Sequence, residues 1–347
     1  MTVRVGVIGV GMIGEDHIRR LTRVLNGARV VAVTDVDADR AAAVAERADG
    51  ARVHGTGRDL IADGEVDAVL VTSWGPTHAE YVLACLAAGK PVFCEKPLAT
   101  TQEDCLRIVD AEVALGRRLV QVGFMRRYDA AYRALKAVLT GGTIGTPTMF
   151  HSAHRNPSVP PSVTTEGVVV DTCVHDIDVS RWLLDSEVAA AQVFLPRRTA
   201  HAAEHLQDPL VLMLEMANGV LVDIEAAVNI VYGYDIRGEV LGETGTVELA
   251  ESSTVIVKRD GRYSGRVPTD WRERFIRAYD VEFQEWLDAV AVGRSTGPSS
   301  WDGYAATVVT DAGVQALRSG ERTPVSMREQ PDLYQGAGRT AGSTGTD

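Results

Sequence analysis

Several features that would narrow the function at once are scarce or missing in this 347-residue sequence. The four cysteines (Cys85, Cys94, Cys105 and Cys173) form no CxxC pair and no disulfide-rich spacing, which fits a reducing cytoplasm. There is no basic run, and a formal net charge of −12 argues against non-specific binding to nucleic acid. The longest apolar runs fall well short of the ~20 residues that span a bilayer, and a strand begins at once at Val3, leaving no room for a signal peptide. We therefore expect a cytoplasmic protein that binds neither nucleic acid nor membrane.

The pattern that is present changes near residue 122. Before it, short β-branched runs alternate with helical patterns, which predicts an α/β Rossmann domain with a doubly wound parallel sheet over residues 1–122. The predicted strands are Val3–Gly9, Val30–Thr34, Val66–Thr72, Pro91–Cys94 and Leu119–Val122. The predicted helices are Ile13–Leu25, Asp39–Ala48, Ala79–Ala88 and Gln102–Ala114.

Longer alternating runs follow, so residues 123–335 are predicted to be an α+β domain with a large, mostly antiparallel, open-faced sheet. Its predicted strands are Val188–Phe194, Leu210–Met216, Val220–Val228, Tyr234–Leu241 and Thr246–Leu249, and its predicted helices are Phe283–Val292 and Tyr304–Leu317. Residues 336–347 are rich in Gly, Thr and Ser and are expected to form a disordered tail.

One strand also bears on assembly. Val220–Val228 has one apolar face, whereas its other face carries Leu221 and Ala227 beside Asp223 and Glu225. A sheet that is apolar on one side and mixed on the other suits a partly polar subunit interface. We therefore predict a homo-oligomer, most simply a tetramer of two-fold symmetry. A monomer that covers this face with its own loops is the alternative.

A dinucleotide fingerprint, Gly9-Val10-Gly11-Met12-Ile13-Gly14, follows the first strand and opens the first helix. A lone GxGxxG is weak evidence, but here Asp35 ends the next strand 21 residues after Gly14, as the motif requires. The helix N-terminus offers backbone N–H groups to phosphate. Asp35 can accept hydrogen bonds from a ribose diol and repel a 2′-phosphate, and Val36 stands where an NADP enzyme often has Arg or Ser. The sequence therefore predicts NAD as the cofactor.

Asp171, His175 and Asp178 recur at i, i+4 and i+7, and on a helix they would share one face. His175 can act as a general base near neutral pH, and Asp171 can hold the protonated ring or a substrate hydroxyl. A solvated helix face with a capping aspartate is the alternative. Lys96, directly after a predicted strand, is either a surface lysine or a cation that stabilises a developing alkoxide.

These motifs resemble the glucose–fructose oxidoreductase/inositol dehydrogenase (Gfo/Idh/MocA) family. The general likeness is carried by Gly9–Gly14, Thr72-Ser73-Trp74-Gly75-Pro76-Thr77-His78 and Glu95-Lys96-Pro97. The likeness to the inositol-oxidising branch of this family is carried by further segments, namely Gln121–Asp129, His154-Arg155-Asn156-Pro157, Asp171 with His175, Tyr232-Gly233-Tyr234-Asp235 and Trp301-Asp302-Gly303-Tyr304. The resemblance extends to about Tyr334. It implies NAD-dependent oxidation of myo-inositol at C2 to a keto-inositol by hydride transfer to the nicotinamide.

The resemblance also implies roles for individual residues. In such enzymes the lysine of the Glu-Lys-Pro motif contacts the reacting hydroxyl, and its Lys–Pro bond is often cis. The catalytic residues implied are Lys96, Asp171 and His175. The substrate-binding residues implied are Arg126, His154, Asn156, Asp178 and Tyr234. The cofactor-binding residues expected are Gly9, Gly11, Met12, Ile13, Gly14, Asp35, Val36, Ser73, Trp74, His78, Glu95 and Lys96.

A structural interpretation competes at several of these positions. Arg126 could be a plain surface charge, Tyr234 a core aromatic on a strand, and Trp74 a packing residue. His151 and His154, three residues apart on a strand, should point to opposite faces and so cannot chelate one metal ion. Since no carboxylate or cysteine has ligand spacing beside them, no metal site is assigned.

Other functions stay open on the sequence. Within the same class, the substrate could be scyllo-inositol, D-chiro-inositol or an aldose such as glucose or xylose. From other classes come an NAD-dependent glycosidase, which recycles its cofactor, and a non-catalytic NAD sensor. The presence of both Lys96 and His175 disfavours the sensor, and net NADH production from free inositol would distinguish a dehydrogenase from the glycosidase.

Overall fold

The structure is a computed structural model that describes residues 2–250 and 255–335 and divides into two compact units. The first unit contains residues 2–123, 280–304 and 328–335, and the second contains residues 124–279 and 305–327. The first break, between residues 123 and 124, lies one residue beyond the predicted boundary. The predicted second domain is not contiguous, however, because residues 280–304 and 328–335 belong to the first unit. The predicted tail, 336–347, lies outside the described residues.

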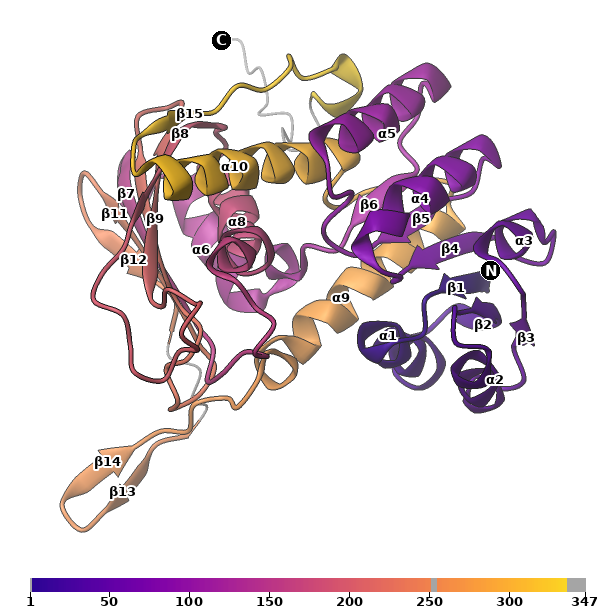
Figure 1. Ribbon diagram of the computed structural model, residues 1–347, viewed down its shortest axis with the longest axis horizontal. Helices are drawn as coiled ribbons and strands as arrows, with labels where there is room; N and C mark the ends of the chain where they lie inside the picture. Colours follow the sequence, from indigo (N-terminus) through magenta and orange to yellow (C-terminus); the bar gives the residue numbers. More distant parts are fainter. Residues whose placement is uncertain (1, 251–254, 336–347) are drawn as a thin grey trace, which may run out of the picture. The chain divides into compact units, whose positions relative to one another are not determined.

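A six-stranded parallel sheet forms the centre of the first unit, with the strand order β3-β2-β1-β4-β5-β6 (Figure 1). Its strands are β1 (Val3–Ile8), β2 (Ala28–Thr34), β3 (Arg52–Val53), β4 (Ala68–Val71), β5 (Val92–Cys94) and β6 (Val120–Val122). Its helices are α1 (Met12–Arg23), α2 (Ala38–Arg47), α3 (Gly57–Ala62), α4 (His78–Ala87) and α5 (Gln102–Leu115). The inner strands β4 and β5 and the edge strand β6 are wholly buried, as helices on both faces of a parallel sheet require. The strand order confirms the predicted Rossmann fold, although the sequence pattern did not indicate β3 or α3.

The second half of a long helix, α9 (Trp271–Ala291), completes the core of this unit. Phe283 and Trp286 are buried among the strand residues, and the Phe283 ring stacks on Phe93 of β5 with ring centroids 4.3 Å apart. The apolar spacing predicts a helix only from Phe283 onward. The helix begins at Trp271 because its charged first half still buries Phe275.

The second unit is built on a seven-stranded sheet with the order β12-β11-β7-β10-β9-β8-β15. Its strands are β7 (Pro147–Arg155), β8 (Val188–Phe194), β9 (Leu210–Met216), β10 (Leu221–Ala227), β11 (Asp235–Gly242), β12 (Thr246–Glu248) and β15 (Thr323–Pro324). All neighbouring pairs are antiparallel except β7 and β10, which run parallel. The prediction of a mostly antiparallel sheet is therefore confirmed.

Helices cover one face of this sheet, namely α6 (Ala130–Thr140), α8 (Val174–Leu184) and much of α10 (Ser300–Ser319) (Figure 1). The apolar face predicted for Val220–Val228 points inward, since Val222, Ile224 and Ala226 are fully buried. On the opposite face, Leu221, Asp223 and Glu225 are half-buried and Ala227 is buried. This difference between the faces confirms the predicted amphipathic strand.

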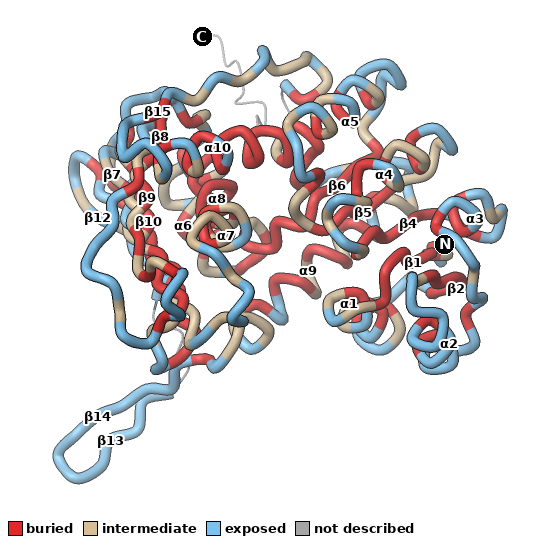
Figure 2. Tube along the Cα trace, in the orientation of Figure 1, coloured by how far each residue is buried: buried red, intermediate tan, exposed pale blue. Residues whose placement is uncertain are grey.

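A separate hairpin leaves the second unit as a projecting arm (Figure 2). It consists of β13 (Val257–Arg259) and β14 (Arg262–Ser264), joined by Asp260 and Gly261, whose φ angles of 51° and 71° are those of a type I′ turn. Every residue from 255 to 267 is exposed. Elsewhere, no helix in the described ranges is both long and apolar enough to cross a bilayer.

Candidate active site

The glycine-rich turn after β1 has the three properties that a dinucleotide site needs. Gly9 has a φ of +88°, and a Cβ there would lie 2.5 Å from the Cα of Ser73. A Cβ on Gly14 would lie 2.1 Å from the Gly9 carbonyl oxygen, so only glycine lets α1 approach β1 this closely. At Gly11, by contrast, an added Cβ would meet nothing nearer than Arg40 Nη1 at 3.9 Å. The second glycine therefore faces open space, where a pyrophosphate can approach the backbone.

The N-terminus of α1 supports the same conclusion. Its N-cap is Gly11, which has no side chain to accept a hydrogen bond from the first-turn N–H groups. These N–H groups and the positive end of the helix dipole thus remain available for phosphate.

Asp35, at the end of β2, is fixed by backbone hydrogen bonds. Its Oδ2 accepts from the N–H of Val10 at 2.7 Å, and its Oδ1 accepts from the N–H of Asp37 at 2.9 Å. Arg40 pairs with Asp37 at 3.0 Å and lies 3.8 Å from Asp35. Asp35 thus connects the fingerprint turn to the end of β2, where a ribose would lie.

Three large apolar side chains are exposed at this edge of the sheet, one at the start of α1 and two in loops. Met12, Val36 and Trp74 have exposed fractions of 65%, 104% and 77%. Each was predicted to contact the cofactor, and the exposure of Trp74 excludes the alternative that it packs in the core. Flat or apolar surfaces of this kind suit the rings of a dinucleotide.

The segment Glu95-Lys96-Pro97 leaves the carboxyl end of β5 at the same edge. Its Lys96–Pro97 peptide bond is cis, as the family resemblance implied. The Lys96 N–H donates to Oε2 of Glu95 at 3.1 Å, and His78 Nδ1 lies 2.7 Å from the Pro97 carbonyl oxygen. His78 is buried, and its Nε2 lies 2.9 Å from the Ser73 carbonyl oxygen. This histidine therefore joins the loops that follow β4 and β5.

In the second unit, several of the predicted residues meet in a buried polar cluster. Asp176 accepts hydrogen bonds from Arg126 Nη1 at 2.5 Å and from the Ser152 hydroxyl at 2.7 Å, and its Oδ2 lies 2.9 Å from His154 Nδ1. Arg126 is 1% exposed, which excludes the surface-charge alternative. Burial alone would raise the pKa of Asp176, but the Arg126 guanidinium and His154 lower it well below its usual range. The carboxylate is therefore ionised and fully paired.

Asp176 itself was not among the predicted site residues. It occupies a core-facing position of α8. Its neighbours along this side of the helix, Cys173, Ile177 and Ser180, are all buried. A carboxylate in a buried stripe is the one sequence signal that could have identified it, because such a group requires a charged partner. Arg126, the partner, lies 50 residues away in sequence.

The helix that carries Asp171, His175 and Asp178 is not regular. Residues Val168–Thr172 form a π-helical turn, and α8 begins only at Val174. Asp171 is exposed, His175 is half-buried, and Asp178 is buried against Arg127, whose Nε donates to it at 2.9 Å. The three side chains therefore do not follow a simple i, i+4, i+7 face. Single π turns of this kind often occur at functional sites.

Two further predicted residues border this cluster. Tyr234 is buried, its hydroxyl lies 3.4 Å from His154 Nε2, and burial raises its pKa. The ring centroids of His154 and His175 are 6.4 Å apart. The Oδ1 atom of Asn156 is buried and accepts no hydrogen bond from the described residues. His151 is exposed on the opposite face of β7 from the buried His154, as the strand period predicts.

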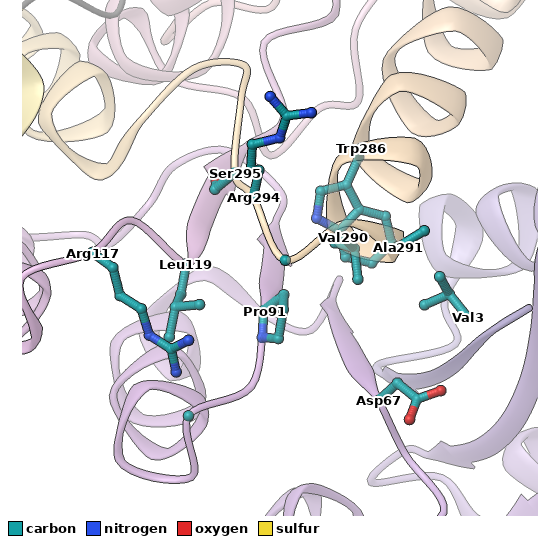
Figure 3. A pocket seen from close by; sticks show the side chains of 12 residues that line it. Val3, Asp67, Pro91, Arg117, Leu119, Trp286, Val290, Ala291, Arg294 and Ser295 are labelled. Atoms are coloured by element: carbon teal, nitrogen blue, oxygen red, sulfur yellow. The ribbon is translucent and has the colours of Figure 1, made fainter. Parts of the chain in front are cut away.

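A cavity of about 280 Å³ lies at the other edge of the first unit (Figure 3). It is lined at the amino ends of the strands by Val3, Pro91 and Leu119, together with Trp286 of α9. The charged side chains around it point in different directions and do not converge on a common point (Figure 3). Since ligands of open α/β sheets bind at the carboxyl ends of the strands, this cavity is not the cofactor site.

A Rossmann sheet with a complete fingerprint, joined in one chain to a mixed sheet with a buried polar cluster, defines a nicotinamide-dependent oxidoreductase. The chain belongs to the Gfo/Idh/MocA oxidoreductase family. Residues 3–124 match the profile described as "Oxidoreductase family, NAD-binding Rossmann fold". Residues 136–327 match "Oxidoreductase family, C-terminal alpha/beta domain".

Individual relatives are similar over nearly the whole chain. "Inositol 2-dehydrogenase 3" of Saccharopolyspora erythraea is 57% identical over 97% of this chain and 99% of its own length. "Inositol 2-dehydrogenase" of Burkholderia cenocepacia is 55% identical over 97% of this chain and 100% of its own. The solved structure of myo-inositol dehydrogenase from Lactobacillus casei, in complex with NAD(H) and myo-inositol, has a TM-score of 0.95 and 40% identity, and covers 96% of this chain and 100% of its own.

Proposed function

We propose that the protein is an NAD-dependent inositol 2-dehydrogenase that oxidises myo-inositol at C2 to 2-keto-myo-inositol. The observation that carries the proposal is the 57% identity to a protein named inositol 2-dehydrogenase 3, which extends over nearly both chains. The glycine geometry at Gly9, Gly11 and Gly14 supports the cofactor. When bound, NAD supplies the nicotinamide that accepts the hydride.

The chain's own residues would handle the hydroxyl proton and the developing negative charge. His175 accepts the proton of the C2 hydroxyl as general base, and Asp171 holds the imidazolium or the substrate hydroxyl. The ammonium group of Lys96 stabilises the alkoxide. These roles come from the family resemblance, and the half-buried positions of Lys96 and His175 support them by leaving each side chain accessible to a small polyol.

The remaining hydroxyls of a cyclic hexol need directional partners. Asn156 is a suitable hydroxyl partner, because its buried Oδ1 can accept without losing a bond already made. Tyr234 and His154 can each exchange their long 3.4 Å contact for a substrate hydroxyl. Arg126 and Asp178 already have charged partners, so we assign them to holding the pocket wall as well as to substrate contact.

A substrate panel tests the proposal. Purified protein should produce NADH from myo-inositol with a higher kcat/KM than from scyllo-inositol, D-chiro-inositol, glucose or xylose. No NADH from any of these compounds, together with release of sugar from a glycoside, would instead identify the glycosidase alternative. A higher kcat/KM for another polyol would move the substrate assignment to that compound.

Two substitutions test the residue roles. Lys96→Ala and His175→Ala should each lower kcat by roughly 10²-fold or more, the usual weight of a positioned acid–base group. Both variants should still bind NADH, because neither side chain forms the phosphate turn. The exposed Lys258 and His201 offer matched controls, and their alanine variants should keep native turnover. Near-native kcat in either test variant would refute that residue's role.

The proposal extends to assembly and compartment. The half-buried sheet face with Leu221, Asp223 and Glu225 supports a subunit interface, and we propose a homotetramer. Light scattering coupled to size exclusion should give four times the 37.3 kDa chain mass, and a mass of one chain at micromolar concentration would refute this. Four buried free thiols support a cytoplasmic location, which cell fractionation tests.

A further inference from the structure

A series of buried, hydrogen-bonded side chains extends from α1 to Glu95 of the Glu-Lys-Pro segment. His17 on α1 is 0% exposed, and its Nε2 lies 2.8 Å from Oε1 of Glu95. Arg20, one turn later and also 0% exposed, donates from Nη1 to His17 Nδ1 at 2.8 Å. Two carboxylates neutralise this arginine: Asp280 accepts from its Nε at 2.8 Å, and Asp16 accepts from its Nη2 at 3.0 Å. All of these residues belong to the first unit.

The contacts determine where the hydrogen of the His17 ring lies. A guanidinium only donates, so Nδ1 must accept from Arg20 and therefore carries no hydrogen. The neutral ring then has its hydrogen on Nε2 and donates it to Glu95. Burial lowers the pKa of His17 below its ordinary value of 6.5, which agrees with a neutral ring in this position.

Glu95 needs both of its oxygens as acceptors. Oε1 accepts from His17, and Oε2 accepts from the backbone N–H of Lys96 at 3.1 Å. Gly123 lies against the carboxylate, since a Cβ added there would lie 3.0 Å from Oε2. On its other side, the His17 ring packs on Phe283 with ring centroids 4.4 Å apart. These contacts thus fix the orientation of Glu95 and, with it, the position of the Lys96 backbone.

We propose that His17 is a positioning residue for Lys96, which it orients through a donated hydrogen bond to Glu95. The proposal rests on the proposed function, in which Lys96 contacts the reacting hydroxyl. A misplacement of about 1 Å at a reacting group can cost 10²-fold in rate. Loss of the His17–Glu95 bond should therefore reduce turnover even though His17 is fully buried and presents no surface to a substrate.

Two amide substitutions of similar polarity separate this role from simple core packing. The side chain of His17→Gln reaches as far as Nε2 and can still donate to Glu95. The side chain of His17→Asn ends at the level of Nδ1, so it keeps the bond from Arg20 but cannot reach Glu95. We expect His17→Asn to lower kcat by about tenfold or more, with KM for NAD and the Kd for NADH within about threefold of native. We expect His17→Gln to keep kcat, KM for NAD and the Kd for NADH within about threefold of the native values.

The complementary substitution is Glu95→Gln, which keeps the size of the side chain but leaves one oxygen to serve two donors. It should also lower kcat, and it tests the proposal if His17→Asn fails to fold. Equal kcat in the Asn and Gln variants of His17, or native kcat in Glu95→Gln, would overturn the proposal. Lys96→Ala distinguishes a failure of the proposed catalytic role of Lys96 from a failure of the positioning role of His17. If that variant keeps native turnover, the proposed function of Lys96 fails, whereas a slow Lys96→Ala beside a fast His17→Asn refutes only the positioning role.

Discussion

Cofactor choice can be predicted quantitatively from Asp35. Its two carboxylate oxygens accept the N–H groups of Val10 and Asp37, and the side chain is 6% exposed, so its negative charge cannot turn away. Arg40 is the neighbouring cation, but it already pairs with Asp37. Val36 offers no charge. A cofactor that carries a phosphate on its adenosine ribose would therefore meet a carboxylate whose neighbouring cation, Arg40, lies 3.8 Å away and is shared with Asp37.

The size of the penalty follows from Coulomb's law. A phosphate monoester carries about −1.5 to −2 charges at neutral pH. At roughly 5 Å from Asp35 this costs about 1.5 kcal/mol if the site behaves as water, and about 6 kcal/mol at an effective dielectric of 20. Even the smaller value corresponds to about tenfold in affinity. We therefore expect the kcat/KM for NAD to exceed that for NADP by at least about tenfold, measured by reduced-nicotinamide absorbance at saturating myo-inositol.

Variants at this position distinguish repulsion from hydrogen bonding. Asp35→Asn removes the charge and keeps the shape, so it should weaken discrimination mainly by improving NADP. Asp35→Ser with Val36→Arg removes the repulsion and adds a phosphate partner, so it should favour NADP, at a cost of about 1 kcal/mol from the lost Val10 bond. If the native protein used NADP as well as NAD, the assignment of Asp35 to the ribose would be wrong.

Two further predictions concern stability. Asp176→Asn leaves the Arg126 guanidinium buried without its carboxylate and should cost about 3–5 kcal/mol in urea unfolding, whereas Glu166→Gln at the exposed pair with Arg318 should leave the midpoint unchanged; equal effects would refute the argument. Burial lowers the pKa of His17 below 6.5 in the folded protein. As the pH falls, the unfolded chain therefore protonates this histidine before the folded protein does. The contribution of the neutral ring is complete above pH 6.5 and is lost as pH falls below it, so the native midpoint should drop more steeply there than that of His17→Gln.

The sequence predicted most reliably those features that depend on neighbouring residues. The fingerprint and the inward face of Val220–Val228 follow from local spacing, and the structure has both. The parallel pairing of β7 with β10 could not be predicted, because an alternating strand pattern does not reveal the direction of its partner. The return of residues 280–304 to the first unit was missed for a related reason. An amphipathic helix indicates a buried face but not the sheet that covers it.

The site shows the same limit. The predicted residues are those whose types and spacing suggest chemistry, but the groups that hold them in place come from distant segments. Asp176 pairs with Arg126 over 50 residues, and His17 reaches Glu95 over 78. The π turn at Val168–Thr172 also leaves no obvious pattern in the sequence. The sequence therefore did not predict the residues that hold the site residues in position, because only the fold brings these distant segments together.

The exposed arm of β13 and β14 has a consequence for the integrity of the molecule. Lys258, Arg259 and Arg262 give trypsin three cleavage positions in a segment exposed along its whole length. A chain cut there would not come apart into its two units. The fragment beyond the cut still supplies residues 280–304 and 328–335 to the first unit and residues 305–327 to the second. The nicked protein should therefore migrate as an intact particle until it is denatured, and the two fragments, produced separately, should recover activity when they are refolded together.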